Sequence, residues 1–154
     1  THKYYVAKYC FQIGLYWQGI THDLSKFSFT EFSGAIKYWD DNISSLANEC
    51  KILGYSQTFL HHRGRNPHHY EYWIHSLDEG GIPAKMPKKY VLELICDYLA
   101  AAKTYGANPR KEYMWWIKQR SHMKIHQETK TYITEVFYKY NTGLTLKESI
   151  NGNY

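Results

Sequence analysis

Apolar side chains recur every three or four residues along most of this chain, the spacing that places them on one face of an α-helix. Residues 2–20 carry such a stripe, which runs from Val6 through Ile13 to Ile20. The pattern predicts a helix over this range, and His2 falls on the same buried stripe. A histidine there can be a core residue satisfied by one hydrogen bond, so its position alone does not make it a ligand.

A second helix is marked at its start by Ser28 and Glu31, which fit a capping box with Ser first and Glu three residues later. Its end is predicted near Gly54, because glycine is favoured just past a helix. A short segment and a loop are expected at 55–67. The face of this helix that is expected to be buried consists of Phe32, Ala35, Ile36, Trp39, Ile43, Leu46 and Ala47.

A third helix is predicted to follow, with Asn66 as a favourable N-cap and Pro67 as a favourable first residue. We therefore expect His68 and His69 in its first turn, and its end near Leu77. The positive end of the helix dipole would keep both imidazoles neutral and able to bind a metal. The free backbone N–H groups at that end would also suit an anion. The alternative is a plain capping turn that carries exposed histidines.

A longer helix is expected to begin at Pro87. Its buried stripe consists of Val91, Leu94, Ile95, Tyr98, Leu99 and Ala102. Asp97 lies at the edge of this stripe, where an unpaired carboxylate would be costly. We expect it to have a partner, which could be a metal, an arginine or the N-terminus of another helix.

Two further helices are predicted toward the end of the chain. Asn141 and Gly143 provide the stop signal for the second one, and a capped turn is expected at 145–148. No segment shows the alternation of a strand, and no internal repeat is present. The patterns together predict an all-α fold, a compact helical bundle that forms a single domain over residues 1–154.

Composition and charge narrow the possible partners. The net charge of +5 favours anionic ligands, but Lys and Arg are scattered with no run of five, which does not indicate nucleic acid. Cys10, Cys50 and Cys96 are an odd number in apolar helical surroundings, so we expect buried thiols in a reducing compartment. No apolar run approaches the roughly 18 residues of a membrane span, and no signal peptide is visible. A cytoplasmic location is therefore expected, and no pattern indicates an oligomeric state.

The most informative chemistry lies at His22-Asp23, where one helical pattern stops and another is about to start. Both residue types are strong metal ligands, and their adjacency lets both side chains turn toward one point. Imidazoles and carboxylates together suit iron, manganese, zinc, nickel or cobalt. Further residues of these types are His2, His61, His62, His68, His69 and Asp97. Since an aspartate can bridge two cations, the set could hold one ion or two and activate water for hydrolysis of a phosphate ester.

The order of His2, then His22-Asp23, then a late Asp97 on a helix resembles the HD-domain superfamily of metal-dependent phosphohydrolases. The sequence His-Asp-Leu-Ser-Lys that ends at Lys26 is similar to the H-D-x-x-K form, in which the lysine lies near the substrate phosphate. The whole chain also looks like a family of bacterial and phage HD-like proteins with H-D-x-S-K-F and N-x-H-H motifs. The resemblance spans residues 2–100 and implies a helical bundle of the HD-domain type.

The resemblance also implies a ligand set. The first metal site would consist of His2, His22, Asp23 and Asp97. The second, if present, would consist of Asp23, His62 and one or both of His68 and His69, with His61 as the non-ligand of its pair. Glu71 would either orient a ligand histidine or serve as an acidic residue in the first turn of its helix.

For the substrate, the resemblance implies a nucleotide or another small phosphate ester, with Asp23 and Lys26 as catalytic residues. Lys26 would contact the phosphate, followed by Arg63 and Arg65, although Lys26 could equally pair with an acidic neighbour. Two other functions use the same ligands. One is a diiron oxygenase of the HD type, and the other is a non-catalytic, metal-stabilised domain that binds an anion or a protein partner. The aromatic surface for such a partner would be Tyr70, Tyr72 and Trp73.

Overall fold

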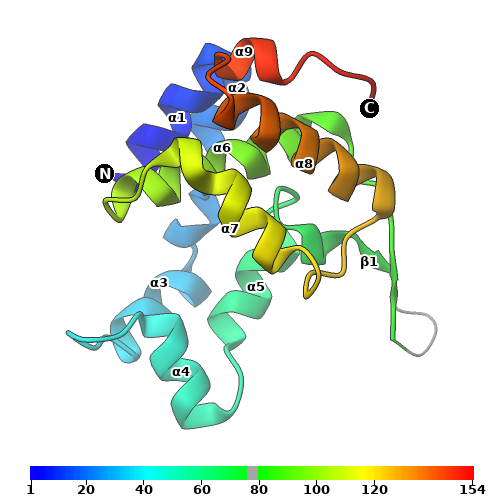
Figure 1. Ribbon diagram of the computed structural model, residues 1–154. Helices are drawn as coiled ribbons and strands as arrows, with labels where there is room; N and C mark the ends of the chain where they lie inside the picture. Colours follow the sequence, from blue (N-terminus) through cyan, green and yellow to red (C-terminus); the bar gives the residue numbers. More distant parts are fainter. Residues whose placement is uncertain (76–79) are drawn as a thin grey trace. The chain divides into compact units, whose positions relative to one another are not determined.

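The computed structural model describes residues 1–75 and 80–154, and these form nine α-helices with one two-stranded sheet (Figure 1). The predicted all-α class is confirmed. Contacts within the chain group these residues into two units: unit 1 contains residues 1–22 and 68–154, and unit 2 contains residues 23–67. The expected single domain over 1–154 stays a prediction. No described helix is both long enough and apolar enough to cross a membrane.

Unit 1 begins with two helices, α1 (His2–Gln12) and α2 (Tyr16–Thr21), where the apolar stripe had predicted one. The break follows from Gly14, which has a φ of +79° in the left-handed region that favours glycine. An apolar stripe with helical spacing can continue across such a break, so periodicity alone does not reveal it. Gly19 in α2 lets the ring of Phe11 approach closely, since an added Cβ would lie 2.8 Å from that ring.

The centre of unit 1 is α6 (Lys88–Thr104), which follows Pro87 as predicted. Its expected stripe is buried at Val91, Leu94, Ile95, Leu99 and Ala102. Although far from α6 in the sequence, α1 packs against it (Figure 1). Cys10 of α1 and Cys96 of α6 are buried as expected. This packing brings the N-terminal histidine beside the carboxylates of α6.

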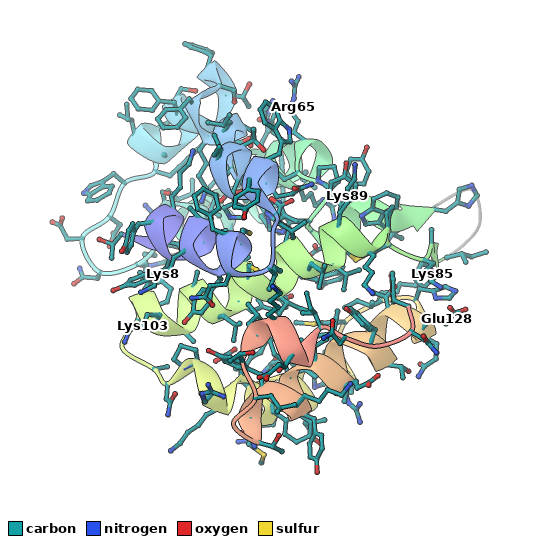
Figure 2. All side chains as sticks on the ribbon, turned by 90° about the horizontal axis from the view of Figure 1, so that it is seen from above. Lys8, Arg65, Lys85, Lys89, Lys103 and Glu128 are labelled. Atoms are coloured by element: carbon teal, nitrogen blue, oxygen red, sulfur yellow. The ribbon has the colours of Figure 1, made fainter. Side chains whose placement is uncertain are left out.

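The remaining helices of unit 1 complete the core around α6. They are α7 (Glu112–Gln119), α8 (Gln127–Asn141) and α9 (Leu146–Ser149). Trp116 of α7 and Phe137 of α8 are almost fully buried. The predicted capped turn is confirmed, because Thr145 and Glu148 form a complete capping box. Figure 2 shows Lys85 beside Glu128 of α8, and the Lys85 Nζ lies 2.5 Å from a Glu128 carboxylate oxygen.

Irregular segments link these helices. They are the 3-10 helices η2 (Tyr70–Trp73) and η3 (Pro109–Lys111) and the strands β1 (Ile74–His75) and β2 (Ile82–Pro83). The strands pair antiparallel, with Ile74 opposite Pro83 and His75 opposite Ile82.

The predicted helix that would start at Pro67 is wrong, since His68 and His69 precede η2 instead of opening an α-helix. The predicted end at Leu77 lies outside the described residues. The physical reason lies in Asn66, whose side-chain amide donates to the carbonyl of His62 one turn earlier. Asn66 therefore closes the preceding helix and does not cap a following one. The expected effect of a helix dipole on the protonation of His68 and His69 is therefore absent, because no α-helix starts at Pro67.

Unit 2 consists of η1 (Leu24–Phe27), α3 (Phe29–Lys37), α4 (Ser45–Leu53) and α5 (Gln57–Arg65). The single helix predicted up to Gly54 is thus two helices, although Gly54 does end the second one with a φ of +80°. The break occurs because the carboxylate of Asp40 accepts hydrogen bonds from the backbone N–H groups of Asn42 and Ile43. The short segment and the loop expected at 55–67 are largely α5.

The face of α3 that was predicted to be buried is exposed. Phe32 and Ile36 of α3 have exposed fractions of 57% and 63%, and Trp39, just after the helix, has 74%. The helix turns Glu31 inward instead, so its polar side faces the interior of unit 2. Cys50 on α4 is exposed for a related reason, because α4 buries its neighbour Glu49.

Candidate metal centre

The candidate metal centre of unit 1 starts from two carboxylates on one helix. Glu93 and Asp97 lie four residues apart on α6, a spacing that places both on the same face of the helix. His2, the first residue of α1, reaches this face. Its Nε2 lies 2.9 Å from the Oδ1 of Asp97. Asp97 therefore has a partner, as expected, and that partner is a histidine of α1, a residue type that the sequence pattern had not suggested for it.

His22, at the C-terminal end of α2, bridges the two carboxylates and is 1% exposed. Its Nδ1 lies 3.0 Å from the Oε1 of Glu93, and its Nε2 lies 3.5 Å from the Oδ1 of Asp97. The Oδ1 of Asp97 is therefore close to Nε2 atoms of both His2 and His22. Three potential ligand atoms thus converge at one position, where His22 is buried and His2 and Asp97 are partly buried.

His68 is the second histidine that contacts Glu93. Its Nδ1 lies 3.1 Å from the same Oε1 atom that accepts from His22, and the two rings are tilted by 36° with centroids 4.4 Å apart. His69 follows, with its ring centroid 4.5 Å from that of His68 and its Nδ1 3.9 Å from the carboxylate of Glu71. Glu71, which was predicted to orient a ligand histidine, is therefore farther from His69 than Glu93 is from His68.

Both carboxylates on α6 are held in the ionised form. Burial tends to raise the pKa of Asp97, but the adjacent imidazoles of His2 and His22 outweigh it and hold that pKa well below its usual range. Burial likewise acts to raise the pKa of Glu93, and hydrogen bonds from His22 and His68 bring it below the ordinary value. A buried and a partly buried negative charge among imidazoles form a site with a clear preference for a cation.

The donor atoms in unit 1 have the spacing of a metal site. One set consists of His2, His22 and Asp97, and another consists of His22, His68 and Glu93. Within each set, the ligand atoms all lie within 4.8 Å of one another. Unit 1 therefore contains buried groups that could hold a metal ion, and the mixture of nitrogen and oxygen ligands suits iron, manganese, zinc, nickel or cobalt.

Unit 2 contains a related arrangement around Asp23. This residue has a φ of +56°, in the left-handed region that aspartate tolerates better than most residues. Its Oδ2 lies 2.7 Å from the Nζ of Lys26, and its Oδ1 lies 3.3 Å from the Nε2 of His62 on α5. Lys26 thus pairs with an acidic neighbour, as its alternative interpretation proposed, while its side chain remains 56% exposed.

The other side of His62 is held by Glu31 of α3, with His62 Nδ1 2.7 Å from Oε2. The second oxygen, Oε1, lies 2.9 Å from the Nδ1 of His61. Burial acts to raise the pKa of Glu31, but hydrogen bonds from Ser25, His61 and His62 lower it overall. The Ser28 hydroxyl accepts a hydrogen bond from the Glu31 N–H, which is one half of the predicted capping box. The Glu31 carboxylate contacts His61 and His62 instead of forming the other half.

The structure therefore brings together some of the predicted site residues. His2, His22 and Asp97 converge in unit 1, while Asp23, Lys26 and His62 do so in unit 2. Arg63 and Arg65 lie on α5, where a loop had been expected. The proposed second metal site draws on residues of both units and stays a prediction.

Sequence reasoning missed Glu31 and Glu93, the two glutamates that hold the histidines. A signal was present for Glu93, because it precedes Asp97 by one helical turn within an otherwise buried stripe. Glu31 gave no such signal, since its position three residues after Ser28 is fully explained by helix capping.

Comparisons with known proteins give one match. No curated protein and no solved structure matches the chain. The family described as "Family of unknown function (DUF5662)" matches residues 1–139, a range that includes every residue of the candidate metal centre. Because the match covers most of its length, the chain belongs to the DUF5662 family.

Proposed function

We propose that this protein is a metal-dependent phosphohydrolase that acts on a nucleotide or another small phosphate ester. The observation that supports it best is the convergence of His2 Nε2, His22 Nε2 and Asp97 Oδ1 in unit 1. These three side chains would hold the cation. When bound, such a cation would act as a Lewis acid and make water nucleophilic near neutral pH.

The chain's own residues would perform the remaining tasks. Asp97 is held ionised and supplies the negative charge that a cation requires. Lys26 holds one oxygen of Asp23 and keeps more than half of its side chain exposed, so its charge remains accessible to a phosphate. Arg65 on α5 is exposed and is a second candidate for that contact. The net charge of +5 favours such an anion.

The decisive experiment is metal analysis of the purified protein, followed by a panel of nucleotides and phosphate esters with manganese, nickel, cobalt, zinc and iron. We expect bound metal and hydrolysis with at least one ion. Asp97→Asn should lose both, whereas His122→Gln, at a histidine outside the cluster, should retain both. A wild-type protein that retains no metal and is not stabilised by any of these ions would contradict the proposal. Activity without oxygen would separate hydrolysis from the HD-type oxygenase.

A second candidate function is supported by the surface of α3. Phe29, Phe32 and Ile36 are 87%, 57% and 63% exposed, and neighbouring large apolar side chains exposed on a soluble protein often mark an interaction surface. A metal-stabilised domain that binds a protein partner through this face would explain it. For that function, Asp97→Asn should lower thermal stability, and the metal-loaded wild type should hydrolyse none of the panel.

A further inference from the structure

We infer that Glu93 and Glu31 are positioning residues, each of which holds two imidazoles through their Nδ1 atoms, so that the Nε2 atoms of His22, His68 and His62 are the ones presented for ligation. The inference rests on the proposed metal centre but concerns residues that the HD resemblance does not include. It follows from the contacts of each glutamate within its own unit.

One carboxylate oxygen of Glu93 contacts the imidazole rings of both His22 and His68. Its Oε1 lies 3.0 Å from the Nδ1 of His22 and 3.1 Å from the Nδ1 of His68. An ionised carboxylate can only accept hydrogen bonds, so both Nδ1 atoms must carry the proton and donate it. This fixes the tautomer of both rings, because a neutral imidazole with a proton on Nδ1 has its lone pair on Nε2.

The orientation of His22 shows the consequence of this tautomer. With Nδ1–H donated to Glu93, its Nε2 faces the Oδ1 of Asp97 at 3.5 Å. A lone pair and a carboxylate oxygen at this distance repel each other unless a proton or a cation lies between them. By holding Nδ1 of His22, Glu93 directs Nε2 of His22 toward the point where Asp97 and His2 also converge. A positive charge at that point would stabilise the arrangement.

Glu31 repeats this arrangement in unit 2. Its two oxygens lie 2.9 Å from the Nδ1 of His61 and 2.7 Å from the Nδ1 of His62. The Nε2 of His62 then faces the Oδ1 of Asp23 at 3.3 Å. The order of glutamate, imidazole and aspartate is the same in both units. Carboxylates that hold the second nitrogen of a ligand histidine are common around metals, where they fix ring orientation and raise ligand basicity.

A third buried glutamate provides a matched control. Glu49 is 2% exposed, like Glu31 at 3%, but it accepts from the hydroxyl of Ser56 and the backbone N–H of Thr58. No histidine contacts it in the described part of the chain. Replacing it by glutamine therefore removes a buried negative charge of the same kind without altering an imidazole.

The first test uses the wild-type protein without metal and needs no variant. We expect nitrogen NMR of histidine-labelled protein to show protonated Nδ1 atoms in His22, His68, His61 and His62, with assignments from single His→Gln variants. Rings of His22 and His68 that carry their only proton on Nε2 would overturn the inference, whether or not the protein binds metal.

The second test measures affinity for zinc and manganese by competition with a chromophoric chelator. Glu93→Gln should bind about 10- to 100-fold more weakly than the wild type, the usual effect of losing a carboxylate behind a ligand histidine. Glu31→Gln should weaken binding in the same direction, and Glu49→Gln should leave it unchanged.

The outcomes separate the inference from the proposed function. A wild type that binds metal and a folded Glu93→Gln variant that binds it equally well would overturn the positioning role and leave the metal centre intact. A wild type that binds neither ion would overturn the metal centre, and the NMR experiment would then decide the inference by itself.

Discussion

At the scale of single residues, the structure assigns different tasks to side chains of the same type. Glu93 and Glu31 orient histidines, whereas Glu49 accepts from Ser56 and Thr58 within unit 2. The histidines and aspartates could be selected from the sequence because few other roles require both types in one pattern. The glutamates could not, because a glutamate in a helix is usually a solvated residue and its burial depends on packing that a pattern does not specify.

Glu49 allows a prediction about acid stability. Burial acts to raise its pKa, but hydrogen bonds from Ser56 and Thr58 outweigh it and hold the pKa below the ordinary 4.5. The ionised form is thus favoured in the folded state, so its contribution is complete above pH 4.5 and is lost as the pH falls through the folded-state pKa. Glu49→Gln should lower the free energy of unfolding by about 1–3 kcal/mol at pH 7.

The measurement is urea denaturation of wild type and Glu49→Gln from pH 7 to pH 3. The difference between them should shrink as the pH falls below 4.5. Glu128→Gln, which removes an exposed carboxylate paired with Lys85, should have little effect at any pH. A difference for Glu49→Gln that does not depend on pH would contradict the argument.

A substitution of Lys26 can show whether this lysine contacts the substrate or only pairs with Asp23. If its exposed ammonium also contacts the phosphate, Lys26→Met should reduce kcat/KM by about tenfold or more and leave metal content unchanged. The matched control is Lys51→Met, at an exposed lysine on α4. Unchanged kinetics for Lys26→Met in an active enzyme would show that the lysine only neutralises Asp23.

At the scale of elements, the sequence predicted α6 well and α3 poorly, for one reason. Periodicity shows that a helix has an apolar face, but it does not show what that face contacts. On α6 the face meets the core, whereas on α3 Phe32 and Ile36 remain exposed and Glu31 turns inward. The predicted helix ends were wrong where one residue can either end a helix or begin one. Asn66, for example, ends α5 and does not begin another helix.

The two helices at the N-terminus provide a test of the glycine that separates them. Gly14 has a φ of +79°, and no described atom lies within 4 Å of a Cβ placed there. Gly14→Ala should therefore cost about 1 kcal/mol of stability from backbone strain alone. Gly64→Ala in α5 is the contrasting variant, because it also has open space but lies in a helix, and it should stabilise by up to about 1 kcal/mol.

Thermal and urea unfolding of both variants would measure these effects. Equal effects of the same sign would contradict the assignment of Gly14 to a left-handed break. The contrast also checks the boundary between α1 and α2, which the apolar stripe over residues 2–20 did not reveal.

At the scale of the whole molecule, the chain consists of two units that each contain a carboxylate–histidine cluster. The unit boundaries fall between His22 and Asp23 and between Pro67 and His68. Each boundary thus lies directly beside a histidine of the unit 1 cluster. The division could not be predicted from composition, since no linker rich in glycine, proline or serine separates the two parts of the sequence.

Metal binding should therefore stabilise unit 1 through α1 and α6, which carry His2 and Asp97. At a free ion concentration 100 times the Kd, the expected gain is about 2.7 kcal/mol. Hydrogen exchange should slow in residues 2–12 and 88–104 when metal is added and recover after treatment with a chelator. Asp97→Asn should show no such difference. Slower exchange confined to α7 and α8 would place the ion elsewhere.

The backbone of Asp23 affects how any mutational scan of this protein is interpreted. For an L-residue that has a Cβ but no short polar side chain, the left-handed region costs about 1–2 kcal/mol of conformational free energy. Alanine at position 23 would thus combine a conformational penalty with the loss of a carboxylate, and a defective variant would not identify which one matters. Asparagine tolerates the same backbone angles, so it is the substitution whose phenotype reports on the carboxylate alone.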